Sequence, residues 1–347
     1  MTLPSPLLAS LGWDAASLPP DDPALLPARI SEVHRDRVTA LSDAGTLTLA
    51  LPHGLTTADL AVGDWCLADP STGLLARVFP RRTLLARRAA GDVSRDQLIA
   101  ANVDTAFLTS SCNADFNEAR LERYLALIHQ GGIAPVILLT KADQTASADD
   151  FLARTAAIAP DVPALALNAK DPATAARLAE WTAPGRTVCF LGSSGVGKST
   201  LANTLTGLTL DTGAIREDDA KGRHTTTARA LFPIPDGGWL IDTPGMRELR
   251  LSDVAEGLEA TFADLAALAR DCRFSDCRHD REPGCAIRAA IEAGTLAAAR
   301  LHRWQKLARE DEMNRASAAE LRAKSRRFGK LTRDAGKHKR RWGDMEE

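Results

Sequence analysis

The chain has 347 residues, of which 45% are hydrophobic and 25% are charged, and its formal net charge is -2. The length indicates two or three domains, the composition is that of a globular protein, and the balanced charge excludes polyanion binding by the chain as a whole. Because the sequence opens with no secretory signal and has no run of about 18 apolar residues, we expect a cytoplasmic protein with no membrane partner.

Two segments precede the nucleotide-binding motifs. Residues 1–27 are rich in Pro, Leu and Ala, and we predict a loosely structured leader. Residues 28–90 contain short alternating strands separated by turns, which favours a small β-barrel of the oligonucleotide-binding type. The clearest strands are Val38–Leu41, Thr46–Leu51, Trp65–Ala68 and Leu74–Phe79.

The pattern then changes, and residues 91–250 are predicted to form an α/β domain. Continuous apolar runs alternate with helical stretches, which is typical of a parallel sheet covered by helices on both faces. The predicted strands are Val103–Thr109, Val136–Thr140, Ala164–Leu167 and Thr187–Leu191. The clearest helices are Asn117–Gln130 and Ala173–Trp181.

The first motif in this domain, Thr140-Lys141-Ala142-Asp143, resembles the guanine-reading (N/T)-K-x-D motif of GTPases. A carboxylate at Asp143 can accept hydrogen bonds from the guanine N1–H and 2-amino groups, a donor pair that adenine lacks. The aliphatic stem of Lys141 would lie against the base. Thr140 stands where Asn is commoner, and an ordinary helix start is the alternative interpretation.

A second short motif, Asn168-Ala169-Lys170, ends the next predicted strand. It resembles the S-A-K loop of GTPases, in which a backbone N–H contacts the guanine carbonyl, although Asn replaces Ser. Its position after the T-K-x-D motif is the order that GTPases use.

The strongest motif follows the strand Thr187–Leu191 and matches G-x-x-x-x-G-K-(S/T). Such a loop directs backbone N–H groups at phosphate oxygens, and the helix behind it adds positive partial charge. The lysine would reach the β- and γ-phosphates, and the following serine would bind Mg²⁺. A chance glycine-rich turn is the alternative. The residues are Gly192, Ser193, Ser194, Gly195, Val196, Gly197, Lys198, Ser199 and Thr200.

Two switch segments follow the phosphate loop. Asp242 in D-T-P-G is expected to hold Mg²⁺ through water, and the Gly245 N–H to sense the γ-phosphate. The polar loop before it, G-R-H-T-T-T, would supply a threonine to the metal, and we choose Thr226 over Thr225. A solvated linker is the alternative interpretation of this loop.

The residue after D-T-P-G is Met246, where Ras-type GTPases carry a glutamine that orients the attacking water. Methionine cannot do this, so we predict slow intrinsic hydrolysis that depends on a partner. His224 is a candidate substitute, and an ordinary loop histidine is the alternative.

Residues 251–325 are predicted to form a helical metal-binding domain. A C-x4-C-x-H-x5-C pattern offers three thiolates and one imidazole, which fits one structural Zn²⁺ with no open coordination position. Free buried cysteines are the alternative. The four ligands are Cys272, Cys277, His279 and Cys285. The other cysteines, Cys66, Cys112 and Cys189, are predicted core residues.

Basic side chains gather at two places. Between Leu321 and Arg341 there are ten Lys and Arg residues against one acid, and residues 326–347 are predicted to form a basic tail that contacts RNA phosphates. A solubilising tail is the alternative. A second basic patch follows the barrel and contains Arg81, Arg82, Arg87 and Arg88.

In ordinary GTPases the phosphate loop precedes the guanine motifs, whereas here it follows them. With this order, the sequence strongly resembles the ribosome small-subunit-dependent GTPase A family, the YjeQ-type circularly permuted GTPases. Residues 28–325 carry the resemblance. The matching motifs are Gly63-Asp64-Trp65, Ala101-Asn102-Val103-Asp104, T-K-x-D, G-S-S-G-V-G-K-S-T, G-R-H-T-T-T, D-T-P-G and the Cys/His pattern.

The resemblance implies an oligonucleotide-binding barrel, a permuted GTPase domain and a zinc-binding helical domain. It also implies GTP hydrolysis to GDP, binding to the small ribosomal subunit and its rRNA late in maturation, and stimulation by that subunit. Nothing in the sequence suggests more than a monomer. A GTPase switch for a protein partner and a module that binds GTP without hydrolysing it are the alternatives, and a P-loop kinase is disfavoured.

Overall fold

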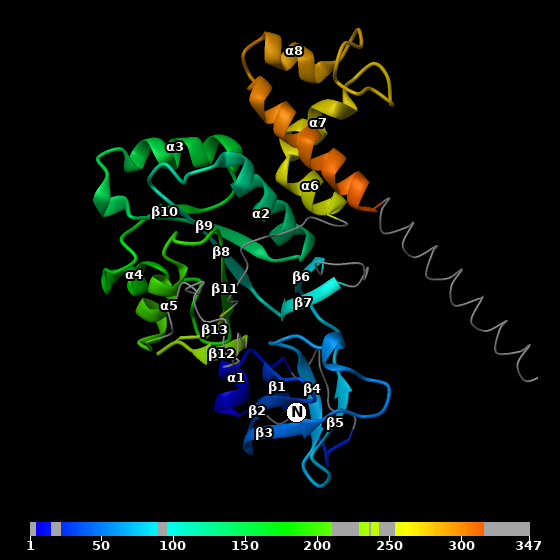
Figure 1. Cartoon of the computed structure of the whole chain (residues 1–347), viewed down its shortest axis with the longest axis vertical. Coiled ribbons are helices and arrows are strands. Elements are labelled where there is room, and N and C mark those ends of the chain that lie inside the picture. Colours follow the sequence, from blue (N-terminus) through cyan, green and yellow to red (C-terminus); the bar gives the residue numbers. More distant parts are fainter. Residues whose placement is uncertain are drawn as a thin grey trace, which may run out of the picture.

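The computed structural model describes residues 5–14, 22–88, 96–209, 229–235, 237–242 and 254–315. A barrel, an α/β domain and a helical domain follow one another along the long axis of the molecule (Figure 1). Among the helices that the structure describes, none combines the length and apolar character needed to cross a membrane.

Five strands close the N-terminal barrel, as the sequence predicts. Each strand pairs with two others in the cyclic order β1-β2-β3-β5-β4-β1, and β3 and β5 are parallel. Small and branched apolar side chains fill its interior. The elements are β1 (Leu26–Val33), β2 (Arg37–Ser42), β3 (Gly45–Ala50), the 3-10 turn η1 (Thr57–Asp59), β4 (Trp65–Asp69) and β5 (Leu74–Val78).

The prediction of a loosely structured leader is wrong for residues 5–14. Helix α1 (Pro6–Ser10) begins where the Ser5 side chain accepts a hydrogen bond from the Leu8 N–H. The buried Trp13 ring then makes edge contacts with Trp65 at 4.9 Å and Phe79 at 5.4 Å between ring centroids. Burial of these aromatic side chains fixes a segment whose composition alone indicates disorder.

A buried arginine joins the barrel to the α/β domain. The Arg29 guanidinium donates to the backbone oxygens of Leu11 at 2.5 Å, Gly63 at 3.3 Å and Asn102 at 2.9 Å. It also donates to Thr187 Oγ1 at 2.7 Å. Burial lowers the pKa of Arg29 to about 10, so the side chain stays charged and needs all these acceptors.

The same joint explains two of the motifs quoted above. Gly63 has a φ of 94°, and a Cβ there would lie 2.1 Å from the Ala101 carbonyl oxygen, so only glycine fits. Asn102 Nδ2 donates to the Gly63 carbonyl at 2.9 Å. Arg81, from the predicted basic patch, pairs with the buried Asp64 carboxylate at 2.6 Å and therefore serves this joint.

The α/β domain contains the parallel sheet that the sequence predicts. Its strand order is β10-β9-β8-β11-β13-β12, with β12 antiparallel, and β12 also pairs with β1 so that barrel and domain share one eleven-stranded sheet. The strands are β8 (Thr105–Ser111), β9 (Ala134–Thr140), β10 (Ala164–Ala166), β11 (Thr187–Leu191), β12 (Ala230–Pro233) and β13 (Trp239–Asp242).

Helices cover both faces of this sheet, and alternate strand residues enter two separate cores. Helices α2 and α3 pack on one face, and α4 and α5 on the other (Figure 1). The predicted helix Ala173–Trp181 is shorter, because the chain tightens into turns from Leu178 onward. The elements are α2 (Glu118–Gln130), η2 (Ala142–Gln144), α3 (Ala148–Ile158), α4 (Ala173–Arg177) and α5 (Lys198–Thr206).

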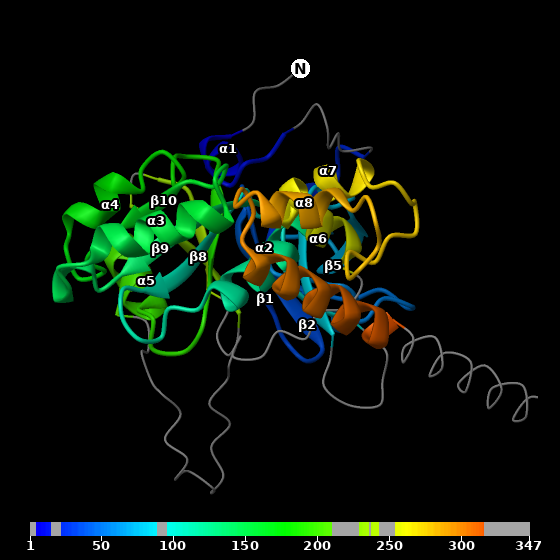
Figure 2. The ribbon, with the colours of Figure 1, turned by 90° about the horizontal axis from the view of Figure 1, so that it is seen from above.

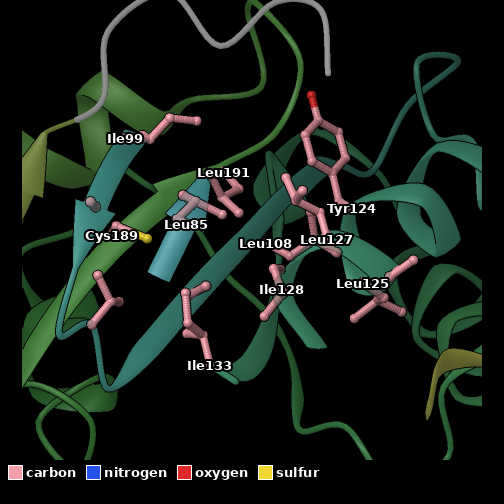
Figure 3. Close-up of a cluster of buried hydrophobic side chains, with 14 of the residues drawn as sticks. Leu85, Ile99, Leu108, Tyr124, Leu125, Leu127, Ile128, Ile133, Cys189 and Leu191 are labelled. Atoms are coloured by element: carbon pink, nitrogen blue, oxygen red, sulfur yellow. The ribbon is translucent and has the colours of Figure 1, made fainter. Parts of the chain in front are cut away.

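One hairpin lies outside the predicted elements. Strands β6 (Leu84–Arg88) and β7 (Asp96–Ala101) form a separate two-stranded sheet between the barrel and the α/β domain. Its buried Leu85 and Ile99 face the same apolar cluster as Leu108 and Ile133 (Figure 3). The hairpin thereby extends the α2-side core toward the barrel.

The C-terminal domain is helical and packs against α2 (Figure 2). A Cβ on Gly257 would lie 1.9 Å from the Ala126 carbonyl oxygen, so α6 and α2 approach closely. The fully buried Glu122 carboxylate pairs with Arg300 at 3.0 Å and Arg303 at 2.6 Å. The elements are α6 (Ala255–Thr261), α7 (Ala263–Arg270), α8 (Ala286–Glu292) and a helix at 298–315.

Candidate functional site

The predicted nucleotide motifs meet at one edge of the parallel sheet. The phosphate loop follows β11, Thr140 is the last residue of β9, and Asn168 comes shortly after β10. Asp242 is the last residue of β13, which neighbours β11. In open α/β sheets this carboxyl edge is where ligands bind, so the fold gathers motifs that lie far apart in sequence.

Glycines give the phosphate loop its shape. Gly192, Gly195 and Gly197 have positive φ angles of 143°, 77° and 98°. A Cβ on Gly192 would lie 2.2 Å from the Thr109 carbonyl oxygen, so the loop can pass β8 only with glycine there. Ser194 and Gly195 form the exposed tip of the loop.

Lys198 begins α5, and its side chain folds back over the loop. The Lys198 Nζ donates to the carbonyl oxygens of Gly192 at 2.9 Å and Ser193 at 2.6 Å. Ser199 is exposed and Thr200 half-buried in the same first turn, where helix N–H groups have no intrahelical partner. A cation beside a helix N-terminus is an arrangement that suits phosphate.

The contacts of Thr140 explain how threonine can replace the commoner asparagine at this position. Its buried hydroxyl donates to the Val196 carbonyl at 2.5 Å and lies 3.1 Å from the Ser110 carbonyl. The first contact ties the T-K-x-D segment directly to the phosphate loop. The hydroxyl is short enough to do this while remaining in β9.

The rest of that segment presents its polar groups outward. Lys141 adopts a left-handed conformation with a φ of 59° and precedes η2, and the Asp143 carboxyl group is exposed. Ala142 is half-buried, and its N–H donates to the Leu167 carbonyl at 3.3 Å. Asp143 is therefore accessible to a base bound at this edge.

The neighbouring loop is fixed by Asn168. Its Oδ1 accepts the Lys170 N–H at 3.0 Å, a turn that serine also forms, which accounts for the substitution. The Ala169 side chain is buried, and its carbonyl accepts the Thr204 hydroxyl of α5 at 2.7 Å. The loop thus packs on the helix that follows the phosphate loop.

Part of the predicted catalytic machinery lies outside the described residues. This applies to His224, Thr225, Thr226, Gly245 and Met246. Asp242 is described, is half-buried at the end of β13, and pairs in register with Ala230 of β12.

The Cys/His cluster assembles as its spacing predicts. Nδ1 of His279 lies 3.6 Å from Cys272 Sγ and 3.5 Å from Cys285 Sγ, and the two sulfurs are 3.9 Å apart. With Cys277, all four ligand atoms lie within 4.8 Å of one another, so the cluster could hold a metal ion. The other three cysteines are buried in the core, as predicted.

Local contacts fix the loop that carries this cluster. His279 has a φ of 61°, and its ring lies 5.5 Å from the Trp304 ring, between centroids. The half-buried Glu282 residue accepts, through its carboxylate, the backbone N–H groups of Arg278, Asp280 and Arg281 at 2.9–3.0 Å. These contacts hold the loop and lower the pKa of Glu282 to about 2.

One residue at the nucleotide edge is not among those predicted from the sequence. Arg120, in the first turn of α2, donates from Nη1 to Ser193 Oγ of the phosphate loop at 3.0 Å. The helix dipole disfavours a cation in a first helical turn. A basic residue in the first turn of a predicted helix is therefore the sequence feature that indicates Arg120 as a candidate.

The closed barrel, the phosphate loop that follows its guanine motifs, and the Cys/His cluster define a circularly permuted GTPase. Comparison with known proteins agrees. The RsgA GTPase family matches residues 78–252, and the chain belongs to this family. It is a GTP hydrolase.

Similar proteins cover most of the chain. The small ribosomal subunit biogenesis GTPase RsgA of Mesorhizobium japonicum is 52% identical over 321 residues, 90% of this chain and 92% of the relative. RsgA 2 of Vibrio parahaemolyticus, also named a small ribosomal subunit biogenesis GTPase, is 47% identical over 315 residues, 90% of this chain and 87% of the relative.

Two solved structures share the fold. YjeQ from Thermotoga maritima superposes with a TM-score of 0.61 at 24% identity, covering 82% of this chain and 97% of that one. YloQ, described as a circularly permuted GTPase, gives a TM-score of 0.59 at 22% identity, covering 86% and 96%.

Replacing Asp143 with Asn is expected to weaken GTP binding about 100-fold, because a charge-assisted acceptor pair for guanine is lost. The new amide should improve binding of xanthosine triphosphate, whose 2-oxo group accepts a hydrogen bond. Fluorescence titration with both nucleotides measures the exchange. Asp149→Asn, at an exposed carboxylate in the first turn of α3, is the matched control. Unchanged GTP affinity in Asp143→Asn would refute the guanine-reading role.

Proposed function

We propose that this chain acts in the cytoplasm as a monomer, binds the small ribosomal subunit, and assists its late maturation, with GTP hydrolysis stimulated by that subunit. The curated relatives are named for biogenesis of that subunit. The hydrogen bond from Thr140 to the Val196 carbonyl carries the nucleotide part of the proposal, because it unites the guanine motif with the phosphate loop.

In this proposal each motif keeps the role that its chemistry indicates. Asp143 and the loop at Asn168 read guanine, and the loop from Gly192 to Thr200 holds the phosphates. Ser199, Thr226 and Asp242 hold Mg²⁺. The ion neutralises phosphate charge when it is bound with GTP. Gly245 senses the γ-phosphate, and His224 is the candidate for orienting water.

The Cys/His cluster suits Zn²⁺ in particular. Zinc–sulfur bonds of about 2.3 Å and a zinc–nitrogen bond of about 2.0 Å, arranged tetrahedrally, place two sulfurs roughly 3.8 Å apart and sulfur and nitrogen roughly 3.5 Å apart. The observed separations of 3.9, 3.6 and 3.5 Å match this geometry. Four protein ligands leave no open position, which supports a structural role.

The proposed division of labour follows the domains. The barrel at 28–90 and the basic tail at 326–347, which lies outside the described residues, would contact rRNA. The GTPase domain at 91–250 would report nucleotide state to the zinc domain at 251–325. Glu122 of α2 supports this link, since it pairs with Arg300 and Arg303 across the boundary.

The test is GTP hydrolysis by the purified chain with and without isolated small ribosomal subunits. Met246 leaves the lone site without a water-orienting glutamine, so we expect stimulation of about 1,000-fold or more, the scale on which groups supplied in trans act. Large subunits are the matched control and should give none. Intact GTP binding with no stimulation by small subunits would favour a switch that serves a protein partner.

A further inference from the structure

The first turn of α2 delivers a second cation to the phosphate loop. Arg120 Nη1 donates to the Ser193 hydroxyl at 3.0 Å, while Lys198 Nζ donates to the Ser193 carbonyl at 2.6 Å. One loop residue is therefore held from both sides by positive groups. We propose that Arg120 is a positioning residue for GTP hydrolysis, acting through Ser193 on the conformation of the phosphate loop. The proposal rests on the nucleotide site proposed above.

The helix that carries Arg120 is rigidly fixed. Asn117 caps α2, and its Oδ1 accepts the backbone N–H of Arg120 at 2.9 Å. Beyond this turn most of the helix is buried, and Tyr124, Leu127 and Ile128 belong to the apolar cluster drawn in Figure 3. A side chain on such a base returns to the same place more reproducibly than one on a mobile loop, as positioning requires.

The electrostatics also indicate an anionic neighbour. A cation in the first turn of a helix is opposed by the helix dipole, whereas an acidic residue there is favoured. Glu118, the acidic residue of this turn, pairs with Arg154 at 3.1 Å and Arg303 at 3.2 Å. A triphosphate held by the adjacent loop would supply the negative charge that offsets the position of Arg120.

The chemistry suits an arginine. A guanidinium has five N–H donors in a planar fork, so it can hold a hydroxyl while raising the positive potential of its surroundings. Phosphoryl transfer depends almost entirely on positioning and on stabilising charge. Holding Ser193 in one orientation fixes the loop N–H groups that face the phosphates, and this affects the rate more than the affinity for the nucleotide.

Four variants of the full chain test the proposal under single-turnover conditions without ribosomal subunits. We expect Arg120→Ala to lower the hydrolysis rate constant about ten-fold, while the dissociation constant for GDP changes less than about two-fold. Ser193→Ala, which removes the acceptor, should give the same loss, and the double variant should be no slower than either single one. Arg120→Lys should recover part of the rate.

Arg309→Ala, at an exposed arginine of the helix at 298–315, is the matched control and should keep the parent rate. Two results would overturn the proposal: a parent-like rate in Arg120→Ala, or a parent-like rate in Ser193→Ala beside a slow Arg120→Ala. Thermal unfolding of each variant excludes misfolding as the cause. Absence of GTP binding in the parent chain would instead count against the proposed nucleotide site, so the two failures are distinct.

Discussion

Replacing Lys198 with Ala is expected to lower GTP turnover about 100- to 1,000-fold, the loss typical of removing one preorganised group that faces developing charge. The Lys198 ammonium bonds the Gly192 and Ser193 carbonyls, so it lies inside the loop that would receive the phosphates. Removing it leaves phosphate charge to the backbone N–H groups and the helix dipole alone. Phosphate release at saturating GTP, with and without small subunits, measures the loss.

Lys306→Ala is the matched control, because Lys306 is an exposed lysine on the helix at 298–315. It should turn over GTP at the parent rate in the absence of subunits. Nucleotide affinity must be measured beside turnover, since the ammonium also contributes to ground-state binding. Turnover by Lys198→Ala within a few-fold of the parent would show that the chain hydrolyses GTP at another place.

The motifs at the nucleotide edge could be predicted from the sequence because their chemistry is local. A strand, a glycine loop and a helix are consecutive in the chain, so the phosphate loop from Gly192 to Lys198 can be recognised from the sequence alone. The same holds for the Cys/His cluster, whose four ligands fall within one short segment. The strands of the barrel could also be predicted, because apolar and polar residues alternate along each hairpin and the apolar ones mark the buried face.

What escaped prediction depends on contacts between distant residues. Arg29 has its acceptors near residues 11, 63, 102 and 187, and no local pattern distinguishes it from a surface arginine. The defined structure of residues 5–14 likewise depends on the contacts of the Trp13 ring with Trp65 and Phe79. In both cases a side chain with an ambiguous local preference is buried only after the barrel and the sheet have met.

The role of Thr140 shows how a deviation from a motif can preserve its mechanics. Thr140 stands where asparagine is commoner. The hydroxyl nevertheless reaches the Val196 carbonyl, so the segment stays joined to the phosphate loop. In the proposed site guanine selectivity would rest on Asp143, so the Asp143→Asn variant is the informative one.

The second large effect is expected at the Cys/His cluster. Cys285→Ser should reduce bound zinc from one ion per chain to nearly none, and should destabilise the helical domain by on the order of 3 kcal/mol or more, because metal binding is coupled to folding. Cys285 is buried at the start of α8, and its sulfur lies 3.5 Å from His279 Nδ1. Zinc content by mass spectrometry and hydrogen exchange over residues 263–292 measure both effects.

Cys112→Ser is the matched control, because Cys112 is a buried cysteine in the core beside α2. It should destabilise the chain through its packing while leaving the zinc content unchanged. Retention of a full zinc equivalent by Cys285→Ser would contradict the four-ligand assignment.

Cys285→Ser should have different effects on GTP binding and on subunit-stimulated turnover. The barrel and the α/β sheet are joined through β1, β12 and the buried Arg29. In Figure 1, β1 and β12 lie far from the helical domain that carries the Cys/His cluster. GTP affinity should therefore survive in Cys285→Ser. The helical domain contacts α2 through Glu122 of α2 and through Gly257 of its own helix α6. Destabilising the helical domain should therefore reduce subunit-stimulated turnover. A parent-like stimulated rate in the zinc-free variant would place the ribosome-responsive surface on the barrel side instead.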